Sequence, residues 1–437
     1  MRSTTRALDR MRRTAAMIAL AAAPACYFDF SDAELDGGGV ADARGGGKAD
    51  GTQGADASHG ADGGGGDGGG ADGGMADAAA PDAGGTPLPP VPFGPFSTLS
   101  ESGLYTDIAS KAIRPDVMEF KPEFALWTDG AAKTRWIWLP PGTQIGTGNM
   151  GRWVFPVGTT AWKEFRDPVT GKRLETRIIQ RLPNSASGAQ FYFASFVWNQ
   201  DDSEAVFDTT SLAEPPVDIP DGCADPAGGG PYPESCHVVP QQALCNRCHG
   251  GEPYKLLGFS AVQLSHDGPG LTLSDLVALD LLSAPPPAGV TYPVPGTPVE
   301  RAAIGTLHAN CGHCHYAQAT QQACFSLTDD TTGVGMAARV LPGDATVQDT
   351  AIWQSAVGQP LDYWTGAMAG NHTEPLITTR IVPGDPQMSA VWYRMSVREW
   401  GQPAPFNDHQ QMPTLGTNEV DPAGLGAVEL WIQSLSP

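Results

Sequence analysis

Two short stretches of cysteine and histidine carry the clearest chemistry of the chain. Each has the pattern Cys-x-x-Cys-His, the attachment signal of a c-type haem. Two thiols three positions apart lie on one helical turn and can both add to the vinyl groups of one porphyrin. The histidine that follows can then bind the iron as its proximal ligand. The residues are Cys245, Cys248 and His249 in the first motif, and Cys311, Cys314 and His315 in the second.

Paired cysteines also occur in zinc ribbons and in thiol redox sites. Histidine makes up only nine of the 437 residues, so a histidine directly after both pairs is hard to ascribe to chance. A zinc ribbon places its pairs about 15–20 residues apart, whereas 62 residues lie between Cys248 and Cys311. The spacing therefore predicts two covalently attached haem c groups, with zinc or thiol chemistry as the alternatives.

A six-coordinate haem needs a second axial ligand, usually methionine or histidine. For the second haem we predict Met412, which precedes a proline in the loop of residues 411–416. Proline and glycine in this loop can fix the sulfur of Met412 toward an iron. The alternative is an ordinary packing contact of the loop.

The first haem has no nearby methionine, because none lies between Met150 and Met336. We predict His308 as its second ligand, since it stands three residues before Cys311 and could reach a neighbouring haem. The alternatives are a histidine on the helix surface and a five-coordinate haem. His313, inside the second motif, is expected to be exposed and without a role. Competing ligands are His237, His266, Met336, Met368, Met388 and Met395.

The net charge of −22 argues against nucleic acid as a partner. An acidic electron carrier suits a basic redox partner protein, which its field would steer toward it. The alternative is that the acidic surface serves only solubility.

The N-terminus has the pattern of an export signal. Residues 1–26 contain five arginines, a short apolar run and small residues that end at Cys26. The apolar run is much shorter than the roughly 20 residues of a membrane-spanning helix. The ending Ala-Pro-Ala-Cys resembles a bacterial lipoprotein signal, although alanine stands where leucine is usual, and ordinary secretion is the alternative. We expect an outer-membrane lipoprotein of the periplasm or cell surface, with membrane contact only through a lipid on Cys26.

Residues 27–95 are expected to be a disordered linker. From Gly37 to Gly85, 20 of 49 residues are glycine, interleaved with alanine and aspartate. Such a composition cannot bury a core.

Residues 96–220 are expected to form an antiparallel β-rich domain, because short aromatic and β-branched runs alternate with turn signals. Six of the eleven tryptophans lie between Trp127 and Trp198. Core packing explains most of them; a face for a glycan or a partner is the alternative. No catalytic signature is present. The expected strands are 135–139, 152–155, 160–165, 175–179 and 191–198.

The pattern becomes helical from about residue 238. A short helix, 241–249, carries the first motif, and Leu271 to Leu282 is apolar at helical spacing. Thr297-Pro298-Val299-Glu300 is a capping box that opens a helix leading into the second motif. Asp421-Pro422 opens a terminal helix that packs against it. We expect a first haem segment at 221–297 and a cytochrome c domain with the second haem at 298–437. The predicted fold class is α+β and multidomain, an antiparallel β-rich domain followed by an all-α c-type cytochrome segment.

Four cysteines lie outside the motifs. Cys223 and Cys236 bracket a loop rich in glycine and proline, and a disulfide between them is plausible in an oxidising compartment. Cys324 could pair with either of them instead, which leaves the connectivity open.

The chain resembles a family of exported bacterial dihaem c-type cytochromes in which a β-rich region precedes the haem segment. The matching stretches together span about residues 96–437. The resemblance implies haem binding and electron transfer and gives no substrate. The Cys223–Cys236 loop and Cys324 depart from the family pattern. The stretches are 124–135, 153–159, 174–177, 307–315 and 412–416.

These observations favour a dihaem electron carrier of the cell envelope. One alternative is a dihaem peroxidase or oxidoreductase that uses an open first haem as its catalytic site. Another is a surface binding module in which the β-rich domain recognises a glycan or partner and the haems are auxiliary. Whether the protein is an enzyme is left open, and the electron carrier is preferred.

Overall fold

The fold is known from a computed structural model. It describes residues 88–186, 188–208, 237, 239–240, 242, 245–250, 256–316, 335–361, 377–398, 411–413, 417 and 419–436. The expected export signal of residues 1–26 and nearly all of the expected linker lie outside these residues.

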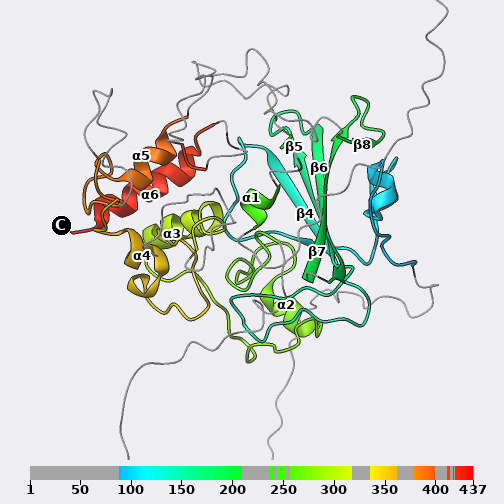
Figure 1. The fold of residues 1–437 in the computed structure, drawn as a ribbon, viewed down its shortest axis with the longest axis horizontal. Coiled ribbons are helices and arrows are strands. Elements are labelled where there is room, and N and C mark those ends of the chain that lie inside the picture. The colour runs from blue at the N-terminus through cyan, green and yellow to red at the C-terminus, as the bar shows by residue number, and fades with distance from the viewer. Residues whose placement is uncertain are drawn as a thin grey trace, which may run out of the picture. The chain divides into compact units, whose positions relative to one another are not determined.

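A six-stranded antiparallel sheet forms the larger part of the β-rich region (Figure 1). Its strands follow the chain order, each pairing with the next, so that the sheet is a meander. The alternation of side chains that predicted strands here is therefore confirmed, as is a mixed α+β fold. The strands are β3 (Met118–Phe120), β4 (Ala132–Trp138), β5 (Thr160–Arg166), β6 (Arg173–Ser185), β7 (Gly188–Trp198) and β8 (Ala205–Phe207).

One expected strand is not a strand. In residues 152–155 the backbone makes only an isolated bridge, between Val154 and Gly146. Trp153 and Phe155 are nevertheless buried, because they pack their rings edge-on against Phe259, at 5.8 and 5.7 Å between centroids. The aromatic run thus supplies core packing without joining the sheet.

The cross-strand register gives the sheet two different faces. Trp136, Trp162, Ile178 and Ala194 lie in one row across β4 to β7 and belong to one buried cluster. We call this side of the sheet the aromatic face. Because successive side chains of a strand point to opposite sides, their chain neighbours point the other way.

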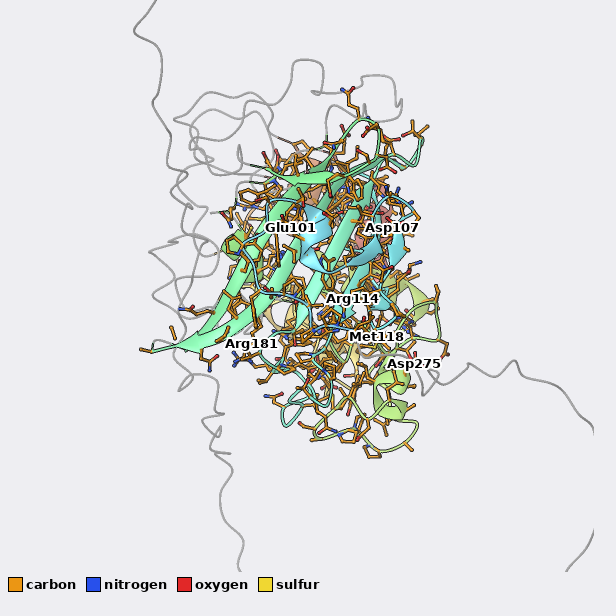
Figure 2. All side chains as sticks on the ribbon, turned by 90° about the vertical axis from the view of Figure 1, so that its right-hand side faces the viewer. Glu101, Asp107, Arg114, Met118, Arg181 and Asp275 are labelled. Carbon is orange, nitrogen blue, oxygen red and sulfur yellow. The ribbon has the colours of Figure 1, made fainter. Side chains whose placement is uncertain are left out.

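The N-terminal part of the chain covers the aromatic face. Leu99 of the 3₁₀-helix η2 (Leu99–Ser102) and Tyr105 of β1 (Tyr105–Asp107) are buried in the same cluster as the sheet tryptophans. β1 pairs with β2 (Ala112–Ile113) in a separate two-stranded sheet. In Figure 2, Glu101 and Asp107 mark this covering segment in front of the strands.

Burial accounts for most of the tryptophans. Of the six between Trp127 and Trp198, all but Trp127 are buried. They therefore form the core of the β-rich region, and the observation that suggested a glycan-binding tryptophan face is explained by packing.

The helices build a second core around α3 (Pro298–Asn310) and the terminal helix α6 (Pro422–Ser434). Both begin as expected. Thr297 accepts from the Glu300 amide, Asp421 accepts from the Gly424 amide, and proline occupies the first turn of each helix. The two helices pack against each other through Leu307, Val428 and Trp431 and their neighbours. The remaining helices are α1 (Cys245–His249), α2 (Leu273–Ala278), α4 (Ala351–Ala356), α5 (Ala390–Ser396) and the 3₁₀-helix η6 (Val347–Asp349).

The segment between β3 and β4 ties the end of α3 in place. The side-chain oxygen of Asn310, the last residue of α3, accepts from the Trp127 amide at 2.7 Å, and its amide group donates to the Ala125 carbonyl at 3.0 Å. Phe124 lies so close to Gly305 that a Cβ on this glycine would be 2.0 Å from the Phe124 ring. Only glycine allows this approach.

The variant Gly305→Ala is expected to destabilise the protein by about 1–3 kcal/mol, because the added methyl group would overlap the Phe124 ring. Gly426→Ala, in α6, is the matched control, since a Cβ there would meet nothing within 4 Å. It should gain up to about 1 kcal/mol through helix propensity. Urea unfolding measures both free energies. Equal effects of the two variants would show that Phe124 does not pack on Gly305.

Candidate haem-binding site

The first Cys-x-x-Cys-His motif forms α1 and lies against β7. The imidazole of His249 packs against the Phe193 ring at 5.8 Å between centroids. Gln242, just before the helix, donates a hydrogen bond from its side-chain amide to the Phe193 carbonyl. The sheet therefore fixes the orientation of this motif.

The second motif continues α3 as one more turn. The amides of Cys314 and His315 donate to the Cys311 carbonyl at 3.0 and 2.7 Å. A Cβ on Gly312 would lie 2.6 Å from the His308 carbonyl oxygen. The backbone oxygen cannot yield, so this position of the motif accepts only glycine.

His315 is held as a proximal ligand would be. Its half-buried imidazole donates a hydrogen bond to the Met336 backbone carbonyl. Metal-ligating histidines usually donate one ring N–H to such a partner, which fixes the ring and leaves the other nitrogen for the metal. Burial, helped by the nearby charges of His313 and Arg394, lowers the pKa of His315 to about 4. The imidazole is therefore neutral at neutral pH, as ligation requires.

The two motifs lie side by side. The thiol of Cys248, in the first motif, hydrogen-bonds with Cys314 and His313 of the second. The hydrogen bond with Cys314 lowers the pKa of Cys248 most, and the hydrogen bond with His313 lowers it further. Together they hold this pKa below its usual value despite burial. Burial alone raises the pKa of Cys311 to about 12. The second cysteines of both motifs are thus direct neighbours, although 65 residues lie between Cys248 and Cys314 in the chain.

The expectation that His313 is exposed is wrong. The side chain is half-buried, and it interacts with Cys248. One ring nitrogen also contacts the Ala309 carbonyl at 3.3 Å. His313 therefore joins the two motifs.

The predicted ligand Met412 is hydrogen-bonded to the backbone of Arg394. The Met412 amide donates to the Arg394 carbonyl at 2.8 Å. The guanidinium of Arg394 is close enough to His315 to affect its pKa. The loop around Met412 is braced by Gln411, which donates to the carbonyl of Thr417 at 2.9 Å. Met412 as a ligand stays a prediction.

His308 is engaged in a hydrogen bond that bears on ligation. Its Nδ1 accepts from the Val340 amide at 3.0 Å, so the ring proton resides on Nε2. Burial lowers the pKa of His308 to about 3, with smaller contributions from Arg339 and His313, and the ring is neutral. A neutral imidazole that binds a metal through Nε2 carries its proton on Nδ1. Nδ1 could then no longer accept from the Val340 amide, so coordination through Nε2 would require this hydrogen bond to break. His308 also lines a small pocket with His313 and Arg339.

The competing ligands lie in varied surroundings. Both ring nitrogens of His266 are hydrogen-bonded, to the Lys121 carbonyl at 2.7 Å and the Gly268 amide at 3.0 Å. Met395 is buried in the helical core, and Met336 packs against it. Met388 is half-buried, and Met368 lies outside the described residues.

His237 belongs to a buried ion-pair network on the sheet. Its Nε2 lies 2.8 Å from Glu175 Oε2 and its ring packs on Phe165 at 5.3 Å. Glu175 also accepts two hydrogen bonds from Arg177, at 2.7 and 2.9 Å. Burial would raise the pKa of Glu175, but Arg177 and His237 together hold it at about 2.

Several expectations fall outside the described residues. They concern the lipid-bearing Cys26 and the pairing of Cys223, Cys236 and Cys324. Across the described ranges, no helix is long and apolar enough to cross a membrane. Within the same ranges, no three His, Cys, Asp or Glu side chains converge as ligands of one metal ion.

Comparison with known proteins gave no match: no family model, no curated protein and no solved structure is similar to this chain.

Sequence patterns did not point to Asn310, Glu175 or Arg177. Asn310 directly precedes Cys311, but only the fold brings it to the 125–127 backbone. Arg177 lies in a strand that reads as ordinary sheet, and its neighbour α1 comes from a segment some 70 residues later. The alternation of charge and apolar residues in β6 was the one available signal.

The pKa of Glu175 predicts acid-sensitive stability. A carboxylate whose pKa falls on folding stabilises the folded state above about pH 4.5 and loses this stabilisation as the pH falls toward about 2. The total is at most about 3 kcal/mol. Glu175→Gln should therefore show a smaller loss of unfolding free energy than wild type between about pH 6 and about pH 3 in urea titrations.

Glu123→Gln is the control for this comparison. Burial raises the pKa of Glu123, so its effect on acid stability has the opposite sign. If Glu175→Gln and wild type lost the same stability over this range, the network would not hold Glu175 ionised.

Proposed function

We propose that this chain is a dihaem c-type cytochrome that carries electrons in the bacterial cell envelope. The observation that carries the proposal is the meeting of two Cys-x-x-Cys-His turns, with Cys248 and Cys314 in contact. Cys245 and Cys248 would hold one haem and Cys311 and Cys314 the other, with His249 and His315 as proximal ligands. Bound haem supplies a one-electron iron couple.

The residues around both motifs fit this cofactor. The carbonyl of Met336 orients the His315 imidazole, and β7 positions the His249 imidazole through Phe193. Met412 is the proposed second ligand of the second haem, and thioether ligation raises a haem potential relative to histidine. His308 is proposed for the first haem, with the Val340 hydrogen bond as the cost of ligation.

The setting of the protein is part of the same proposal. Haem attachment to such motifs takes place outside the cytoplasm, which agrees with the export signal and with a lipid on Cys26. The resemblance to exported dihaem cytochromes supports it. The net charge of −22 favours a basic redox partner protein.

Double serine variants test the proposal. Cys245→Ser with Cys248→Ser, and Cys311→Ser with Cys314→Ser, should each retain one covalent haem, whereas wild type retains two. Cys324→Ser is the control and should keep both. Haem is counted from the alkaline pyridine spectrum of denatured protein. Wild type without covalent haem would overturn the proposal.

A dihaem peroxidase or oxidoreductase is the second candidate, and the hydrogen bonds of His308 and His266 favour it. Both histidines would have to break a contact to bind the first haem iron, which leaves this iron open to a small ligand. Carbon monoxide should then bind one reduced haem of the two. A protein in which neither haem binds carbon monoxide is an electron carrier only.

A further inference from the structure

Three cationic side chains stand in a row across the sheet, on the side opposite the aromatic face. Arg135 of β4 is the cross-strand partner of Lys163 in β5, and Lys163 is the partner of Arg177 in β6. Residues directly opposite in an antiparallel pair have Cβ atoms about 4.5–5.5 Å apart, and like charges there are destabilising. We call Arg135, Lys163 and Arg177 the cationic row.

Charge compensation in the cationic row is incomplete. Arg177 pairs with Glu175, but that carboxylate is already shared with His237. Among the residues that the structure describes, the side chains of Arg135 and Lys163 make no hydrogen bond and no ion pair. The ammonium of Lys163 lies 4.7 Å from the centroid of the Phe165 ring.

The cationic row is also partly shielded from water. Arg135 is 6 % exposed and Lys163 is half-buried, whereas the Arg177 side chain is 26 % exposed. Burial, then repulsion from its cationic neighbours, lowers the pKa of Lys163 far below its usual value. Burial lowers the pKa of Arg135 to about 10, and burial with the two arginines lowers that of Lys133 to about 8. Buried charges are normally paired, and among the described residues no carboxylate pairs with Arg135 or Lys163.

An apolar row runs beside the cationic row on the same face. Two residues further along the strands, Ile137, Ala161, Ile179 and Phe193 are successive cross-strand partners. A free inorganic anion needs only the charges. A ligand with an apolar body and acidic groups at one edge uses both rows, and this is the chemistry of a porphyrin with two propionates.

The first haem motif lies on this same face. Its cysteines, Cys245 and Cys248, are close enough to Arg177 to raise its pKa, and His249 packs on Phe193 of the apolar row. Propionates lie on the porphyrin edge opposite the thioether bonds. Starting from Arg177, the row extends through Lys163 to Arg135 over two strand spacings of about 4.8 Å each.

We propose that Arg135 and Lys163 bind the propionate carboxylates of the haem attached at Cys245 and Cys248. This inference rests on the proposed function, and it assigns to the β-rich region a direct part in holding a cofactor. Arg177, committed to Glu175, stands between the propionate site and the cysteines and holds the row in register.

The reduction potential of the first haem tests the proposal. A cation beside an ionised propionate favours the reduced iron, so Lys163→Met should lower one of the two potentials. A tenfold change in the reduction equilibrium corresponds to about 59 mV for one electron, and we expect a change of about this size. In Lys163→Met the unpaired propionate should also titrate. The reduction potential of the first haem should therefore fall with rising pH in this variant, over a range in which the wild-type potential is steady.

Matched variants separate charge from fold. Lys121→Met removes the same charge from an exposed position and should leave both potentials unchanged. Lys163→Arg keeps the charge and should retain the wild-type potential. If Lys163→Met fails to load haem, the reduction potential of the first haem is measured in Arg135→Gln instead. The bending band of the propionates in the resonance Raman spectrum is then compared between Lys163→Arg and wild type.

The outcomes distinguish this inference from the function on which it rests. Wild type with two haems, and Lys163→Met with unchanged potentials and pH dependence, would overturn the propionate site alone. Wild type without haem would overturn the proposed function. A lowered potential in Lys163→Met that Lys163→Arg restores supports the propionate site.

Discussion

The cross-strand register of the six-stranded sheet is the constraint on which the rest of the structure depends. The register places Trp136 beside Trp162 and Arg135 beside Lys163. Because successive side chains of a strand point to opposite sides, these two pairs lie on opposite faces of the sheet. A slip of one residue would exchange the two faces. The aromatic face is closed by the N-terminal segment, which leaves the other face for the first Cys-x-x-Cys-His motif.

The position of the second motif depends on a different set of contacts. Asn310 binds the backbone of residues 125 and 127, and Gly305 admits Phe124. These contacts fix the end of α3 immediately before Cys311. The same segment reaches the terminal region, where Asp129 accepts from the Glu419 amide at 2.8 Å. The β-rich region and the helical core therefore share the task of positioning the two motifs.

Much of this could be predicted from the sequence, because the signals were local. The strand predicted at residues 160–165 and the capping box predicted at Thr297 depend on short-range geometry. Both predictions are confirmed. The run at 152–155 misled because aromatic residues serve core packing as well as strands. The contacts of Cys248 with Cys314 and His313, and the cationic row, arise from tertiary pairing. Spacing along the chain carries no information on such pairing.

The central claim is that the two motifs hold two covalent haems, and the intact mass of the exported protein tests it most directly. We expect the mass of the processed chain plus two haem groups, retained under denaturing conditions. The mass of the chain alone, from cells able to attach haem to proteins outside the cytoplasm, would contradict the account.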